Sequence, residues 1–146
     1  MRAQNHHEFQ WERARKQHGV VARRQLRAIG CSEKAIKHAL ASGRLHRTEW
    51  DGVYSVGRPD LTRLGRLMAA VLAMGDRAVL THQSAAALWG IYEYRGREVH
   101  VSVPTKRTRS GVRPHRRALR RREVTYERGI PVTTPAHGHR HGGAAR

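Results

Sequence analysis

Apolar residues at helical spacing mark the first part of the chain. Segments 8–18, 22–29 and 33–42 each have a composition that favours a helix, and in the last of them apolar residues recur every third or fourth position. Ser32 stands where it can cap the helix at 33–42, and Gly43 stands where that helix would end. The pattern predicts three short helices in succession, with Val20 and Val21 as an extended link after the first.

A hairpin is predicted directly after these helices. The segments "LHR" (45–47) and "VYSV" (53–56) have the composition of short strands, and "EWDG" between them supplies a polar turn. Two short helices joined by a glycine-containing turn, the second of them cationic, followed at once by a hairpin, form the pattern of a winged helix-turn-helix. We therefore predict a winged helix-turn-helix DNA-binding domain over residues 1–58.

Residues 61–135 are expected to form a second, small α+β domain. Apolar residues at positions i, i+3, i+4, i+7 and i+8 predict a helix from Thr62 to Met74. Segment 78–90 predicts a short strand and then a helix capped by Thr81 that buries Trp89, and "EVHVSVP" (98–104) alternates as a half-buried strand would. A further strand is expected near 112–117, and residues 123–133 are expected to form a hairpin or a bent strand, so the fold class is α+β.

The C-terminal residues depart from these patterns. Thr134 and Pro135 are typical of the first residues of a helix, but "HGHRHGGAAR" supplies no apolar stripe to continue it. We predict that residues 136–146 form a disordered tail, and that the chain either stops early or continues in an altered reading frame after the start of a helix.

The net charge of the chain indicates the class of partner that it binds. The 146 residues carry 29 Lys and Arg against 11 Asp and Glu, which gives a net charge of +18 and attracts polyanions, above all nucleic acid. No apolar run is long enough to span a membrane, and the N-terminus is too charged for a signal peptide. We expect a cytoplasmic protein that binds double-stranded DNA and no membrane. RNA is a weaker alternative, because few aromatic residues stand near the basic runs.

The candidate DNA contacts are cations of the predicted helices, of the hairpin and of a basic turn. Long cations at the start of a recognition helix can reach base edges, whereas cations on the hairpin and flanks bind phosphates. Residues 106–122 hold nine Lys and Arg and can add a sequence-independent, salt-sensitive contribution. The alternative is a solvated cationic surface. The predicted contacts are Arg23, Arg24, Lys34, Lys37, His38, Arg44, Arg47, Lys106, Arg107 and Arg109.

The sequence gives little support for a catalytic site or a metal site. A restriction-type nuclease needs clustered carboxylates for Mg²⁺ and an acid two residues before a Lys, and none of the four lysines is preceded in that way. His82, two residues before Ser84, is expected to be a surface or capping residue, and the histidines of the tail to be incidental. We expect no enzyme, no metal site and no cofactor.

Four motifs carry a resemblance to a known family. "KQHGVVARRQL", "GRLHRTEWDGVYSVG", "HQSAAALWG" and "GIPVTTPA", in that order and spacing, resemble the AbiEi-type antitoxins of actinobacteria over about residues 14–136. The resemblance implies an N-terminal winged helix-turn-helix and a repressor of its own operon that opposes a nucleotidyltransferase toxin without a tight complex with it. Whether the chain forms a homodimer is left open.

The sequence also departs from that family. Relatives have Ser or Thr where Ala22 stands, so the helix at 22–29 lacks a side-chain cap. Relatives also continue beyond "TTPA" into a further helix and a domain similar to very-short-patch-repair endonucleases. The alternative to an antitoxin is therefore a truncated, non-catalytic remnant of such a nuclease-like protein.

Overall fold

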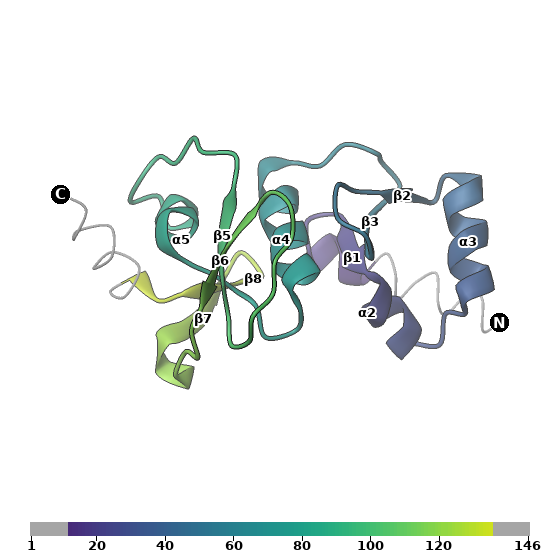
Figure 1. The fold of residues 1–146 in the computed structure, drawn as a ribbon. Helices are drawn as coiled ribbons and strands as arrows, with labels where there is room; N and C mark the ends of the chain where they lie inside the picture. Colours follow the sequence, from purple (N-terminus) through teal and green to yellow (C-terminus); the bar gives the residue numbers. More distant parts are fainter. Residues whose placement is uncertain (1–11, 136–146) are drawn as a thin grey trace. The chain divides into compact units, whose positions relative to one another are not determined.

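The computed structural model describes residues 12–135, which form a mixed α+β fold with two β-sheets (Figure 1). The chain divides into two compact units, residues 1–73 (unit 1) and 74–146 (unit 2), each with its own sheet. The predicted domain boundary near residue 60 stays a prediction. No helix within the described range is long and apolar enough to cross a membrane. The predicted tail at 136–146 and the start of the first predicted helix lie outside that range.

Unit 1 begins with a helical segment at residues 12–16 and ends in a long helix. Its elements are β1 (Val20–Ala22), α2 (Arg23–Ala28), α3 (Glu33–Ser42), β2 (Leu45–Arg47), β3 (Val53–Val56) and α4 (Arg63–Met74), whose last residue lies beyond the division between the units.

The sheet of unit 1 has the strand order β1-β3-β2, and both pairings are antiparallel. β2 and β3 are the predicted hairpin. The extended link expected at Val20 and Val21 is instead a strand, because the backbone of β1 pairs in register with Val53–Ser55. That pairing places the start of α2 next to the hairpin, where the Arg23 N–H donates to the Gly52 carbonyl over 2.7 Å.

Local signals explain the ends of the two central helices. The Ser32 side chain accepts a hydrogen bond of 3.0 Å from the Ala35 N–H and caps α3, and Gly43 ends it in the left-handed conformation with φ of 82°. Ala22 has no side-chain oxygen to cap α2. Gln25 compensates in part, since its Oε1 accepts from the Ala22 N–H over 2.9 Å.

The core of unit 1 lies between its helices and its sheet. Apolar residues from both helices and both strands of the hairpin are buried, and Ile29 and Leu40 pack at the edge of this core. Cys31 is buried in the turn between α2 and α3 and reads as a packing residue. The buried cluster comprises Ala14, Val21, Leu26, Cys31, Ile36, Ala39, Leu45, Tyr54 and Val56.

Unit 2 is built on a five-stranded mixed sheet of order β6-β5-β4-β8-β7 (Figure 1). The pairs β5·β6 and β4·β8 are parallel, and β4·β5 and β7·β8 are antiparallel. Helix α5 packs against β5 and β8. The elements are β4 (Val79–Leu80), α5 (His82–Leu88), β5 (Val99–Val103), β6 (Val112–Arg116), the 3-10 turn η1 (Arg121–Glu123), β7 (Val124–Glu127) and β8 (Ile130–Thr133).

Two expectations for unit 2 need correction. All five residues of β5 are buried, so it is not the half-buried strand that its alternation predicts, because it runs between β4 and β6 inside the sheet. Thr81 holds the N-cap position of α5, but its side chain makes no capping hydrogen bond. Trp89 follows the helix as its C-cap residue, and its indole N–H donates to the Thr133 carbonyl over 2.9 Å.

Candidate nucleic-acid interface

The outward face of α3 carries three of the predicted contact residues. Lys34, Lys37 and His38 are exposed, while Ile36 and Ala39 on the opposite face are buried in the core. Within residues 12–135, none of these three side chains has a hydrogen bond or an ion pair with another residue. The two lysine ammonium groups and the His38 ring therefore face solvent, where an anionic partner can reach them.

The turn between α2 and α3 is held by an ion pair that the sequence analysis missed. Glu33, the first residue of α3, pairs with Arg23 and, at 3.8 Å, with Arg27, both from α2. Arg23 and Glu33 each keep 48% of their side-chain surface exposed. Arg23 therefore lies beside the candidate surface, and its guanidinium is already engaged by Glu33.

Arg24 points toward a different element. Its guanidinium donates a hydrogen bond of 2.8 Å to the Leu72 carbonyl in the last turn of α4. A cation at this position is favourable, because the carbonyls at a helix C-terminus carry partial negative charge. The structure thus gives Arg24 a partner within unit 1, and DNA contact by Arg24 stays a prediction.

The hairpin carries the other two predicted cations of unit 1. Arg47 is exposed on β2, which is an edge strand of the sheet, and no ion pair joins it to another residue of the described range. Arg44, between α3 and β2, is half-buried, and its Nε donates to Ser42 Oγ over 3.2 Å. Arg47 is therefore the more accessible of the two.

The remaining predicted contacts lie in unit 2, in the loop between β5 and β6. Lys106 and Arg107 are exposed, and Arg109 is half-buried. The structure gathers these three in one loop of one unit, as a second basic segment apart in sequence from α3 and the hairpin.

Unit 2 also contains a histidine cluster that sequence reasoning did not find. The ring of His82 stacks on that of His115, with centroids 3.8 Å apart and planes 11° apart. His115 Nε2 lies 3.0 Å from His100 Nδ1, and His100 Nε2 lies 3.2 Å from the Tyr94 hydroxyl. His82, expected at the surface or as a cap, is half-buried in this stack. The sequence carries no signal for this cluster, because the alternation of Val99, Val101 and Val103 places His100 on the polar face of its predicted strand.

The cluster has one strongly shifted group. Burial, together with the neighbouring His115 and Arg113, lowers the pKa of His100 to about 4, and Glu98 opposes the shift. His100 is therefore neutral at physiological pH. Across the described part of the chain, no group of three or more His, Cys, Asp or Glu side chains could hold a metal ion. The tail histidines lie outside that part.

No model of a known protein family matches the chain, and no curated protein sequence matches it. The resemblance to AbiEi-type antitoxins thus rests on the four sequence motifs alone.

Proposed function

We propose that unit 1 is a winged helix-turn-helix that binds double-stranded DNA, with α3 in the major groove and the β2–β3 hairpin along the phosphate backbone. The observation that carries the proposal is the outward face of α3. There Lys34, Lys37 and His38 are exposed and unpaired within the described range, directly before a hairpin whose exposed cation is Arg47.

The dimensions and side chains of α3 suit a groove. Its 10 residues correspond to about 15 Å of helix, and a major groove about 12 Å wide admits an α-helix. Ala35 and Ala41 are also exposed on α3, and methyl groups let the helix backbone approach the base edges closely. Lys34 and Lys37 lie in the first two turns, the part of a recognition helix that contacts bases.

Both recognition elements are fixed before binding. Ile36 and Ala39 hold α3 against the core of unit 1, and Trp50, buried in the hairpin turn, packs under Arg66 of α4. Elements that are already ordered lose less conformational entropy on binding. This arrangement favours a sequence-reading interface over a flexible polycation.

At the level of the cell, the proposal is a repressor that occupies operator DNA of its own operon, as in AbiEi-type antitoxins, and acts without catalysis. The four motifs support this role, and the charge of +18 supports a polyanionic target. In this role a toxin would be opposed without a tight protein complex, and the DNA would be the principal partner.

The test is binding to a labelled fragment of the gene's own upstream DNA, against a scrambled duplex, at two salt concentrations. We expect a preference of about a hundredfold or more that survives moderate salt. The double variant Lys34→Ala/Lys37→Ala should lose the preference. The matched control is Arg95→Ala/Arg97→Ala, which removes the same charge from an exposed loop of unit 2.

Two results would contradict the proposal. Equal binding to both duplexes that collapses with salt would leave a polycation, as expected of a non-catalytic remnant of a nuclease-like protein. Equal loss of preference in both double variants would show that net charge, and not α3, determines binding.

A further inference from the structure

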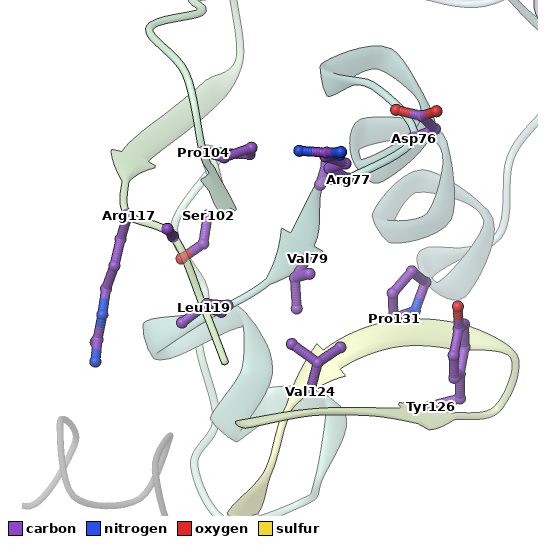
Figure 2. Close-up of a pocket in the computed structure, with 12 residues that line it drawn as sticks. Asp76, Arg77, Val79, Ser102, Pro104, Arg117, Leu119, Val124, Tyr126 and Pro131 are labelled. Atoms are coloured by element: carbon purple, nitrogen blue, oxygen red, sulfur yellow. The ribbon is translucent and has the colours of Figure 1, made fainter. Parts of the chain in front are cut away.

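A pocket of about 410 Å³ opens on the sheet of unit 2. It is formed by the segment that precedes β4, by β5, by the residues after β6 and by the β7–β8 hairpin (Figure 2). Its walls combine apolar side chains with a few polar and charged ones. Those on which the argument depends are Arg77, Val79, Ser102, Val124, Tyr126 and Pro131.

Ser102 lines this pocket from the middle of the sheet. It pairs in register with Val79, so both side chains lie on the same face. Ser102 is only 2% exposed, and its hydroxyl is one of two buried side-chain oxygens in the described range that have no hydrogen-bond partner. A buried hydroxyl without a partner is unfavourable, and a polar group of a ligand would satisfy it.

The charged side chains of the pocket lie near its rim. Arg77 is exposed and has no ion pair within residues 12–135, and it lines the pocket together with Asp76 and Pro104 (Figure 2). Arg117, from the far side, pairs with Glu123 over 3.2 Å. Arg77 is therefore the cation available to an anionic group, and Asp76 can accept hydrogen bonds from amino or hydroxyl groups next to it.

Tyr126 supplies an aromatic surface at the same pocket. It is 69% exposed, the most exposed of the large hydrophobic side chains in the described range, and it pairs across the hairpin with Pro131. Val124, also from β7, continues the apolar wall (Figure 2). Exposed aromatic rings beside cations are the usual stacking platforms for nucleic acid bases.

We propose that this pocket binds a nucleotide unit, with the base stacked on Tyr126 and the phosphate held by Arg77. Ser102 would contribute a hydrogen bond to a polar edge of the ligand. Two sources share this chemistry, a free nucleotide and an unpaired nucleotide of a single strand. The proposal concerns unit 2 and does not depend on the duplex interface of unit 1.

The sequence alone argues against such a site, because no aromatic residue stands beside Arg77. The β7–β8 hairpin brings Tyr126 to it from 49 positions further along the chain. Their presence in one pocket is thus a product of the sheet, in which β8 pairs with β4 at Leu80, three residues after Arg77.

The experiment measures binding of AMP, adenosine and a short single-stranded oligoadenylate to the full chain by calorimetry. We expect Tyr126→Ala to weaken binding of whichever phosphorylated ligand binds by about tenfold, and Tyr126→Phe to retain it. Arg77→Ala should remove the advantage of AMP over adenosine. Tyr92→Ala is the matched control, because Tyr92 is also exposed, at 52%, and does not line the pocket.

The outcomes distinguish a free nucleotide from a nucleotide of a single strand, and they also include results that would overturn the proposal. Binding of AMP that depends on Tyr126 and Arg77 identifies a free nucleotide, whereas binding of the oligonucleotide alone, with the same dependence, identifies a single strand. Absence of binding by the unaltered chain, or equal weakening by Tyr92→Ala and Tyr126→Ala, would overturn the proposal. Oligonucleotide binding that is lost in Lys34→Ala/Lys37→Ala but kept in Tyr126→Ala would overturn it as well. Unchanged thermal unfolding of each variant establishes that the fold is intact.

Discussion

The guanidinium of Arg66 lies over the indole of Trp50, 5.3 Å from the ring centroid, and Arg66 Nε donates to Glu49 Oε1 over 2.9 Å. Trp50 is 2% exposed and Glu49 precedes it in the hairpin turn, while Arg66 belongs to α4. This contact attaches the turn of the hairpin to the helix that follows it. The hairpin is thereby held by a buried aromatic side chain as well as by its strand pairing.

Replacing Trp50 with Ala should destabilise unit 1 strongly. Truncation of a buried aromatic side chain costs about 3–5 kcal/mol, because burial is lost and a cavity remains. The measurement is the free energy of unfolding from urea denaturation followed by circular dichroism. Arg66→Ala, which removes only the half-buried partner and leaves the indole in place, should cost much less. A loss below about 1 kcal/mol for Trp50→Ala would mean that the indole does not support the hairpin.

Much of the fold could be predicted because its signals are local. The bounds of α3 follow from Ser32 and Gly43, which act within one helical turn of the ends that they define. β1 could not be recognised, because three residues form a strand only when Val53–Ser55, some thirty positions later, lie beside them. The burial of β5 was missed for a related reason. Its polar His100 is accommodated by Tyr94 and His115, which local periodicity does not reveal.

The candidate nucleic-acid interface could likewise be predicted from the sequence only where its features are local. Exposure of Lys34, Lys37 and His38 follows from helical periodicity, since the apolar residues of α3 occupy the other face. The partners of Arg23 and Arg24 depend on tertiary contacts, which a pattern along the chain cannot supply. Sequence therefore identifies the cations, and the structure shows which of them are already engaged.

Cations of the two recognition elements should respond differently to mutation. Arg47→Ala should weaken binding to the upstream fragment and to the scrambled duplex alike, and reduce the slope of log K against log salt by about 1, because a phosphate contact carries no sequence information. Lys37→Ala should chiefly reduce the preference between the duplexes. Titrations at several salt concentrations measure both effects. A change of preference in Arg47→Ala would instead place base contacts on the hairpin.

The stability of unit 2 should fall as the solution is acidified. His100 has a folded pKa of about 4, lowered by burial and by His115 and Arg113, against an ordinary value of 6.5. Between pH 6.5 and pH 4 the unfolded chain therefore binds a proton at this position that the folded chain largely does not bind, and the loss of free energy of unfolding accumulates over this range. The loss reaches up to about 3 kcal/mol.

Urea denaturation of the wild type and of His100→Asn at pH 7, 6, 5 and 4.5 measures this effect. The variant should have a lower free energy of unfolding at pH 7, because the contacts with Tyr94 and His115 are lost. It should also show a shallower decline with acidification. Parallel curves for the two proteins would mean that His100 titrates alike in the folded and unfolded chains.

Gly65 of α4 should not tolerate a side chain. A Cβ at this position would lie 2.9 Å from the His18 carbonyl oxygen and 3.1 Å from Thr62 Oγ1. Neither neighbour is free to give way, because His18 O belongs to the backbone and Thr62 Oγ1 accepts from the Gly65 N–H over 2.9 Å. Within a helix Gly→Ala ordinarily stabilises by about 1 kcal/mol, but forced overpacking costs about 1–3 kcal/mol.

We therefore expect Gly65→Ala to lower the thermal midpoint of unfolding, while Arg63→Ala, at an exposed position of the same helix, leaves it nearly unchanged. A higher midpoint for Gly65→Ala would show that the backbone at His18 moves away at little cost and that helix propensity decides the outcome.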